Sequence, residues 1–357
     1  MVKQKRASSC GLGARDKRNR VTRQAVSLLL ALVFICTAGF GAMAVHAENL
    51  VPVGRTVGIS LESDGVVVVG VPEKCSDDMT ASPARAAGFK AGDIIVRLGA
   101  NIVKTCLDLK DATTRNGDTK VAVHVLRGGV ARQLEITPVK TANGEFSLGV
   151  WVRDGISGIG TVTFYNPETG QFGALGHSVS DSETGVLIPV RSGSISRASV
   201  SDVAKGKTGA PGQLHGQFSF DDKLGEVLNN TQHGIFGTAR GAFDDGPVFE
   251  TATESEIHTG DAYILSNVAG TEVRRYTIEV TRVYKGGESD ERSMLVTVTD
   301  PELIEATGGI VQGMSGSPII QDGKIIGAVT HVLINDPTKG YATSIEKMLA
   351  SAVGINA

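Results

Sequence analysis

Apolar and polar residues alternate in short stretches over most of the chain from residue 54 onward. Clear examples are TVGISL at 56–61, VAVHVLR at 121–127 and RYTIEVTRVY at 275–284. A period of two predicts half-buried β-strands, and the glycines, aspartates and asparagines between the stretches predict tight turns. Helices are expected only at 83–88, 107–116 and 344–353. The pattern therefore predicts a mainly β protein.

The stretches fall into two groups, separated at 141–144 by a segment that we interpret as a linker. The first predicted domain, 54–140, begins with a hairpin in which Gly65 makes the turn. A short helix started by Pro83 and ended by Gly88 follows, then a second helix and two closing strands. Residues 145–357 hold a longer series of short strands, which predicts a β-barrel or sandwich.

The first 47 residues have a different pattern. Residues 1–24 carry a net charge of +7, the whole chain carries −3, and residues 25–45 contain no charged side chain. This apolar run is long enough to cross a membrane as a helix, and its basic flank predicts a cytoplasmic N-terminus with an exported body. We therefore predict a basic head at 1–24 and a signal anchor at 25–47, which excludes a nucleic-acid-binding arm. A cleaved signal peptide, with a loose cleavage site at Val45-His46-Ala47, and a buried core helix are the alternatives.

Composition restricts the chemistry. With 41% hydrophobic residues and 45 glycines, the chain is in the globular range and rich in turns. Of four cysteines, only Cys75 and Cys106 lie in the exported part, where a disulfide and two free thiols are both allowed. The Cys and His spacing resembles no metal site, so neither a metal nor a cofactor is expected.

One part of the first domain resembles a known module. SPARAAGFKAGDIIVRLG at 82–99 and the strand pair around Arg127-Gly128-Gly129 are similar to a PDZ domain of the type attached to bacterial proteases. The resemblance implies that backbone N–H groups hold the carboxylate of a chain end, while the peptide adds as an extra strand. By position, the carboxylate loop spans 55–59, and the candidate peptide-binding residues are Val57, Gly58 and Ile59. A β-rich spacer with an unused groove is the alternative.

The segment GMSGSPII at 313–320 carries the strongest chemical motif of the second domain. A serine between glycines, followed by Ser-Pro and an apolar strand, is the arrangement used by chymotrypsin-like serine peptidases. Gly313 lets the backbone turn so that its N–H and that of Ser315 can point at one oxyanion. Ser315 is therefore the candidate nucleophile, and an incidental serine in a glycine-rich hairpin is the alternative.

A nucleophilic serine needs a base, and His177 in FGALGHS at 172–178 is the candidate. It precedes Ser315, as histidine precedes serine in the chymotrypsin order. The alternative is a buried histidine whose ring N–H caps a loop. The other exported histidines are His124, which we interpret as structural, His215, His233, His258 and His331.

The export signal, the PDZ-like module, GALGHS and GMSGSP occur in this order, and over nearly its whole length the chain resembles the SpoIVB peptidase family of endospore-forming bacteria. The resemblance implies a membrane-tethered serine endopeptidase in the space between forespore and mother cell. Such proteins release themselves by self-cleavage and then cut a membrane-bound regulator of an intramembrane metalloprotease, which activates a late sigma factor.

The expected partners are therefore that regulator, the chain's own N-terminal region, and the membrane through residues 25–45. We expect the self-cleavage within 47–57, a polar stretch that is accessible if extended. A non-catalytic PDZ-containing scaffold at the membrane surface is the alternative function. A phosphate loop at Gly206-Lys207-Thr208 is excluded, because the motif's first glycine would fall on Ser201.

The resemblance also maps the acid of the triad onto Asp300, 15 residues before Ser315. The sequence itself allows Asp181 and Asp202 as well, and a strand-end aspartate can also serve as a cap. Such a carboxylate accepts a hydrogen bond from the second ring nitrogen of His177 and fixes its tautomer. Because the acid lies closer to the serine than in chymotrypsin, the predicted fold is a variant chymotrypsin-like barrel.

Overall fold

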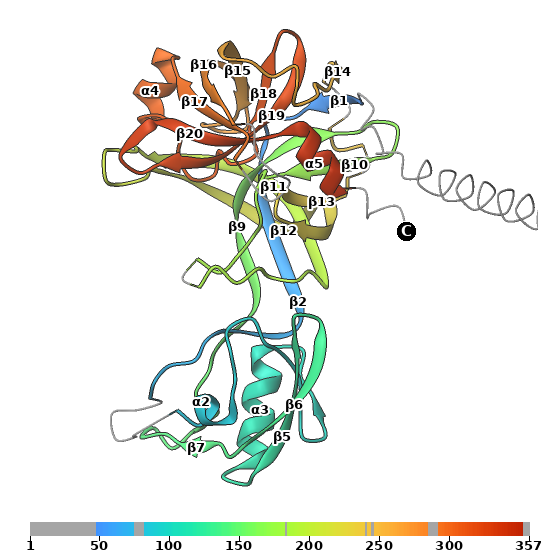
Figure 1. Cartoon of the computed structure of the whole chain (residues 1–357), viewed down its shortest axis with the longest axis vertical. Helices are drawn as coiled ribbons and strands as arrows, with labels where there is room; N and C mark the ends of the chain where they lie inside the picture. Colours follow the sequence, from blue (N-terminus) through green and yellow to red (C-terminus); the bar gives the residue numbers. More distant parts are fainter. Residues whose placement is uncertain are drawn as a thin grey trace, which may run out of the picture. The chain divides into compact units, whose positions relative to one another are not determined.

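A computed structural model describes residues 48–74, 82–182, 184–239, 241–243, 246–284 and 292–352. The predicted basic head and signal anchor lie outside these residues, as does Cys75. Among the described helices, none has the length and apolar character needed to cross a membrane. The described residues are mainly β, as the alternation predicts (Figure 1).

The PDZ-like domain is built on a sheet of order β2–β3–β5–β6. Its elements are β2 (Thr56–Gly70), α2 (Pro83–Ala87), β3 (Ile94–Leu98), β4 (Asn101–Ile102), α3 (Cys106–Asn116), β5 (Val121–Arg127) and β6 (Val130–Ile136). Pro83 lies in the first turn of α2, and Gly88 ends it at φ 84°, as predicted. Asp93 and Arg127 form an ion pair that joins β5 to the loop before β3.

The predicted hairpin around Gly65 is wrong. β2 runs as a single strand, with a register irregularity between Glu62 and Val67. The cause is tertiary, because the first half of β2 pairs with β11 and β9, whereas its second half pairs with β3 and the beginning of β9. Both halves are therefore held in sheets that a turn at Gly65 would separate.

Most of the remaining strands, together with β2, form two closed six-stranded units. In the first, the additional pairing of β9 with β2 closes the order β9–β10–β13–β12–β11–β2. Its members besides β2 are β9 (Trp151–Tyr165), β10 (Gln171–Ala174), β11 (Ser192–Ala204), β12 (Gln213–Thr231) and β13 (Gly234–Thr238). Long strands let β2 and β9 belong to both this unit and the PDZ-like domain (Figure 1).

The second unit is a closed barrel of order β15–β16–β17–β20–β19–β18. Its elements are β15 (Gly260–Ser266), β16 (Arg274–Val283), β17 (Met294–Val298), α4 (Pro301–Thr307), β18 (Pro318–Gln321), β19 (Lys324–Leu333), β20 (Asp336–Ser344) and the predicted C-terminal helix α5 (Ile345–Ala352). Each unit has its own apolar core, and the PDZ-like domain has a third.

Two short connections differ from their predicted roles. The expected linker at 141–144 is the turn of a small hairpin, β7 (Val139–Lys140) with β8 (Phe146–Ser147). The expected self-cleavage segment, 47–57, contains strand β1 (Asn49–Pro52), which pairs with β14 (Phe249–Glu250) and β9. Leu50 and Val51 are buried, which contributes about 2 kcal/mol for each side chain.

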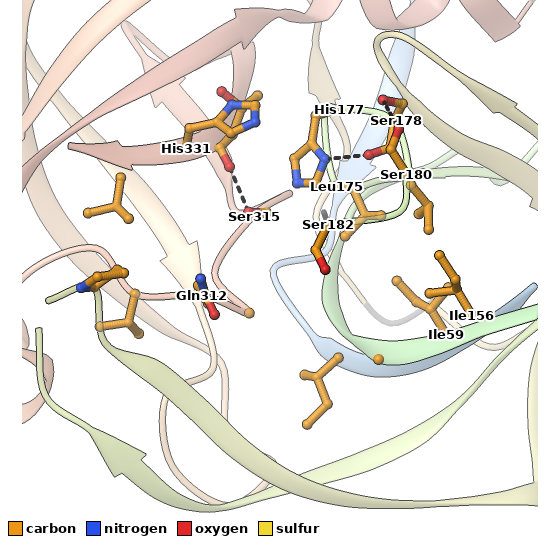
Figure 2. Close-up of a pocket in the computed structure, with 18 of the residues that line it drawn as sticks. Ile59, Ile156, Leu175, His177, Ser178, Ser180, Ser182, Gln312, Ser315 and His331 are labelled. Carbon is orange, nitrogen blue, oxygen red and sulfur yellow. Dashed lines mark hydrogen bonds between the residues drawn. The ribbon is translucent and has the colours of Figure 1, made fainter. Parts of the chain in front are cut away.

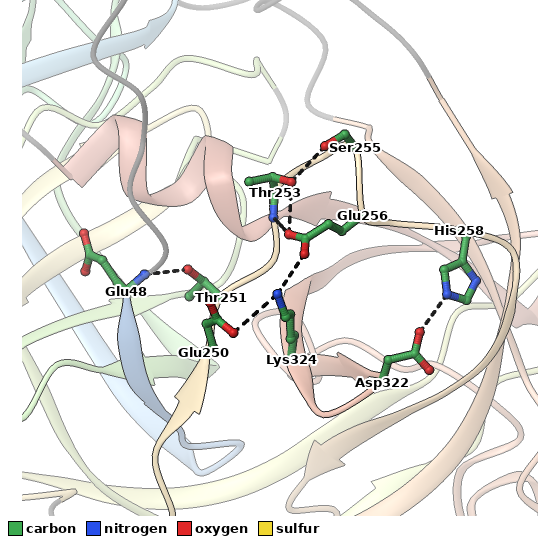
Figure 3. A network of polar contacts seen from close by, with 9 residues as sticks. All are labelled: Glu48, Glu250, Thr251, Thr253, Ser255, Glu256, His258, Asp322 and Lys324. Atoms are coloured by element: carbon green, nitrogen blue, oxygen red, sulfur yellow. Dashed lines mark hydrogen bonds and ion pairs between the residues drawn. The ribbon is translucent and has the colours of Figure 1, made fainter.

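A polar network fixes the start of β1 (Figure 3). The Glu48 backbone N–H donates to Thr251 Oγ1 at 2.9 Å, and the Thr251 N–H donates back to the Glu48 carbonyl. Lys324 Nζ reaches Glu250 at 3.3 Å and Glu256 at 2.7 Å. The stretch from residue 48 to 57 is thus extended and mostly paired, and apart from the exposed Asn49 its residues are buried or half-buried. The expectation of an accessible cleavage segment is therefore wrong for these residues.

Candidate active site

The loop before β18 holds Ser315 between two glycines with positive φ. Gly313 has φ 100° and Gly316 has φ 98°. A Cβ on Gly316 would lie 2.0 Å from the Thr161 carbonyl oxygen, so glycine is required there on steric grounds as well. The Met314 N–H donates to Val311 and the Ser317 N–H donates to Met314, which keeps the loop tightly turned.

Two backbone donors of this loop are available to a ligand. The Gly316 N–H donates to the Val329 carbonyl at 2.7 Å, whereas within the described part of the chain the N–H groups of Gly313 and Ser315 donate to no protein acceptor. These are the two groups that the motif predicts for an oxyanion hole.

Strand β9 supports the same loop through Thr161. The Thr161 N–H donates to the Ser315 carbonyl at 3.0 Å, and its hydroxyl donates to the Gly313 carbonyl at 2.8 Å. Both carbonyls therefore point at β9. The sequence does not single out Thr161, because nothing in TVTFY distinguishes it from an ordinary buried strand threonine.

His177 is placed by a strained turn after β10. Leu175 has φ 71° and Gly176 has φ 72°, and a leucine rarely adopts this left-handed conformation. The Leu175 N–H is held by the Thr161 carbonyl at 3.1 Å. Such strain is common where a side chain must be aimed at a site.

The tautomer of His177 follows from its hydrogen bond. Nδ1 lies 2.8 Å from the Ser178 carbonyl oxygen, which can only accept, so Nδ1 must carry the proton. In the neutral ring, Nε2 is then an acceptor, the state that a general base needs. The Ser178 carbonyl thus fixes the tautomer of His177, and the identity of a triad acid stays a prediction.

Ser315 and His177 line the same cavity, which has a volume of about 720 Å³. Figure 2 shows the Ser315 side chain and the imidazoles of His177 and His331 around it. Ser315 Oγ donates to the Thr330 carbonyl at 2.7 Å. The structure therefore brings the two predicted residues to one cavity. The serine hydroxyl is hydrogen-bonded to a backbone carbonyl there.

His331 is a site residue that the sequence analysis left without a role. Its ring centroid lies 4.9 Å from that of His177. The residue as a whole is exposed, but desolvation of its ring, followed by the charges of His177 and Arg292, lowers its pKa to about 4. His331 is thus neutral at pH 7. Its position in GAVTHV could have identified it, because this segment of β19 directly follows β18, the strand after the nucleophile loop.

Asp300 and Asp181 each have hydrogen-bond partners in the structure. Asp300 is the N-cap of α4: Oδ1 accepts from the N–H groups of Glu302 and Leu303, and Oδ2 accepts from that of Thr277. It is absent from the described lining of the cavity. The structure therefore gives Asp300 the capping role that the sequence had left open, and mutagenesis can test whether it also acts in catalysis.

Asp181 lines the cavity but is 2% exposed. Its Oδ1 accepts from the N–H and hydroxyl of Thr184, and Arg153 Nε lies 2.5 Å from its Oδ2. Asp202 is exposed on β11, opposite His215, and does not line the cavity.

The predicted carboxylate loop is also wrong. Val57, Gly58 and Ile59 lie inside β2, where β9 pairs with one edge and β11 with the other. Their strand edges therefore have no room for an added peptide, and Ile59 lines the cavity of Ser315 instead.

Aliphatic side chains form much of the cavity wall. They come from both six-stranded units and the segments between them: Ile59, Ile156, Ile159, Leu175, Val179, Ile310, Val311, Val332 and Ile334. Among the described residues, no cluster of His, Cys, Asp or Glu could hold a metal ion. Cys106 is a free thiol, and burial, followed by the nearby Asp154 carboxylate, raises its pKa to about 11.

Two closed β-units that bring a serine and a histidine to one cavity, next to a PDZ-like domain, define a PDZ-containing serine peptidase. Residues 144–349 match the family model of SpoIVB peptidase S55, and residues 56–137 match that of the PDZ domain. The chain belongs to the SpoIVB peptidase S55 family.

Similar solved structures exist for both parts. The PDZ domain of the SdrC-like protein Lmo2051 from Listeria monocytogenes is 25% identical, covers 25% of this chain and 87% of its own, and has a TM-score of 0.21. The active form of the Rv3671c protease from M. tuberculosis is 15% identical, covers 57% of this chain and 75% of its own, and has a TM-score of 0.36. No curated protein matches the sequence.

Proposed function

We propose that Ser315 and His177 are the catalytic residues of this serine peptidase. The observation that carries the proposal is their meeting in one cavity, with the imidazole held in the tautomer that can accept a proton. The available N–H groups of Gly313 and Ser315 support an oxyanion hole at the same loop.

In the proposed reaction, Ser315 Oγ turns from the Thr330 carbonyl, transfers its proton to His177 Nε2 and attacks the scissile carbonyl carbon. The oxyanion accepts hydrogen bonds from Gly313 and Ser315. The imidazolium then protonates the leaving amine, and water hydrolyses the acyl-enzyme by the same route in reverse. The Ser178 carbonyl stabilises the imidazolium through Nδ1–H.

Labelling by a sulfonyl fluoride tests this assignment and separates it from the non-catalytic scaffold. We expect stoichiometric modification of the parent protein at Ser315 and none in Ser315→Ala. Ser157→Ala, which alters an exposed serine on β9, is the matched control and should label normally. Failure of the parent to label would favour the scaffold.

We further propose that the substrate is a membrane-bound regulatory protein of the sporulation pathway, cut on the exported side of the membrane. Membership of the SpoIVB peptidase S55 family and the charge pattern of residues 1–45 support this role. The aliphatic cavity wall supports a preference for apolar side chains next to the scissile bond. Cleavage of a peptide library should show this preference, and a preference for charged residues would contradict it.

Self-cleavage remains part of the proposal, at a revised position. Because β1 is paired on both sides and Leu50, Val51 and Pro52 are buried, we expect the cut before Glu48. N-terminal sequencing of the released form locates it. Equal processing of Ser315→Ala and the parent in a bacterial host would mean that another peptidase makes the cut.

A further inference from the structure

The PDZ-like sheet has its ligand edge filled by the chain itself. PDZ domains take a peptide as an added strand at a sheet edge. Here the edge of β2 at Val67–Gly70 pairs antiparallel with Trp151–Arg153, the beginning of β9. The strand that a ligand would add is therefore already present.

The side chains of this segment alternate as those of a bound peptide would. Leu148, Val150 and Val152 pack into the core of the PDZ-like domain, and Leu148 is 3% exposed. Trp151 points the other way and is 57% exposed, with its ring over Gly70, where a Cβ would lie 2.6 Å from a ring atom. Backbone pairing together with alternate buried side chains is the mode of β-strand addition.

Helix α3 closes the other side of the segment. The helix packs against both β8 and β9. The backbone N–H of Cys106, in its first turn, donates to Asp154 Oδ2 at 2.7 Å. A cavity of about 440 Å³ remains between α3 and residues 141–152, and it leaves space where a second chain could begin to exchange.

We propose that residues 146–154 occupy the peptide site of the PDZ-like domain in cis, and that an extended apolar peptide regulates the peptidase by displacing them. The displacing peptide is defined by its chemistry: it is an extended chain with apolar side chains at every second position. The regulatory half of this proposal rests on the proposed catalytic function, whereas the binding half does not.

The displaced segment leads directly to the proposed active site. Arg153 lies 2.5 Å from Asp181, which lines the cavity near His177. Further along the same strand, Thr161 holds the Ser315 and Gly313 carbonyls. Release of the first residues of β9 would therefore loosen supports of both the histidine segment and the nucleophile loop.

Peptide binding tests the cis-occupied state. The probe is a fluorescein-labelled synthetic peptide with the sequence of residues 146–154, FSLGVWVRD, and the proteins are full-length Ser315→Ala and its Val150→Asp derivative. A charge at this half-buried position, which packs against the core of the PDZ-like domain, should weaken the docked segment, so we expect at least tenfold tighter binding to Val150→Asp. Val130→Asp, at a 58% exposed position on β6, is the matched control and should bind like Ser315→Ala alone. Equal affinity, or no binding by either protein, would overturn the proposal.

A second measurement does not depend on the folding of Val150→Asp. Trp151 is the single tryptophan of the chain, so the Ser315→Ala protein can be titrated with unlabelled FSLGVFVRD. We expect a shift in Trp151 emission and faster hydrogen exchange of residues 150–153. Unchanged exchange at saturating peptide would show that the edge is not exchangeable.

In the active protein, the rate of hydrolysis of a short apolar substrate should fall at least threefold on addition of the same peptide, because release of the first residues of β9 loosens the supports of the site. An unchanged rate despite proven displacement would overturn the regulatory half alone. Absence of any hydrolysis and of sulfonyl fluoride labelling would count against the catalytic function, while the binding result would stand separately.

Discussion

At the residue scale, the site depends on a few backbone groups that aim two side chains. The Ser178 carbonyl fixes the proton of His177, and the glycines around Ser315 let its loop turn. These backbone groups position the two side chains, which carry out the chemistry. Substitution of Ser315 or His177 should therefore lower kcat/KM the most.

We expect Ser315→Ala and His177→Ala each to remove most of kcat/KM, and the double variant to be little worse than either. The physical reason is that a serine without its base, or a base without its serine, cannot perform the shared proton transfer. Steady-state hydrolysis of a short peptide measures this, with Ser157→Ala as the control. Additive losses in the double variant would argue that the two residues act independently.

Asp300→Asn should affect stability more than chemistry. An amide retains one acceptor oxygen for three backbone N–H groups, so we expect a loss of about 1 kcal/mol in the free energy of unfolding. kcat/KM should stay within a few-fold. Urea unfolding and kinetics measure the two effects, with Asp202→Asn as the exposed control. A loss of several decades in a folded protein would restore Asp300 to the triad.

At the element scale, β9 and β2 join the PDZ-like domain to the first β-unit, because they pair with each other in both, on either side of a register irregularity. Each strand has pairing partners in both, so a substitution in either can act at a distance. This sharing distinguishes the chain from two domains joined by a flexible linker.

Thr161→Val should lower activity without unfolding the protein. The shape is retained, but the Gly313 carbonyl loses the hydroxyl that donates to it, which costs about 1–3 kcal/mol for a buried acceptor. Because that carbonyl belongs to the nucleophile loop, we expect kcat to fall at least tenfold. Thr163→Val on the same strand, also fully buried, is the control. Equal kinetic losses would indicate general damage to β9.

Gly58→Ala should damage the peptidase unit rather than ligand recognition. A Cβ there would lie 2.2 Å from the Phe218 ring, so the ring of Phe218, and with it the packing of β12 on β2, would have to change. We expect reduced thermal stability and parallel loss of short-peptide and protein cleavage. Selective loss of protein cleavage alone would support the original assignment of Gly58 to a ligand loop.

At the scale of the whole molecule, pH couples the site to stability through His331. Its pKa is about 4 in the folded chain and near 6.5 when unfolded. Over that interval the unfolded chain binds more protons, so the contribution of His331 to stability is complete above pH 6.5 and is lost as pH falls toward 4.

We therefore expect the melting temperature to fall between pH 6.5 and 5, and less steeply in His331→Gln than in the parent. Activity should also fall at acidic pH, because a protonated base cannot accept the serine proton. Melting curves and pH–rate profiles measure these effects. An unchanged slope in His331→Gln would show that its ring does not titrate as described.

The sequence by itself determined the local structure and the chemical motifs. Pro83 and Gly88 set the limits of α2, alternation identified most strands, and GALGHS and GMSGSP supplied the histidine and serine that the fold brings together. These features depend on backbone conformations and side-chain periods within a few residues, which a sequence displays directly.

Only the tertiary structure decided which groups share a surface. It made β2 one strand instead of a hairpin, because two sheets hold its halves, and it buried Leu50 and Val51 within the expected cleavage segment. It placed Asp300 on a helix end and residues 151–153 on the PDZ-like edge. Pairing between segments far apart in the chain determines these outcomes, and the period of a strand contains no information about its partner.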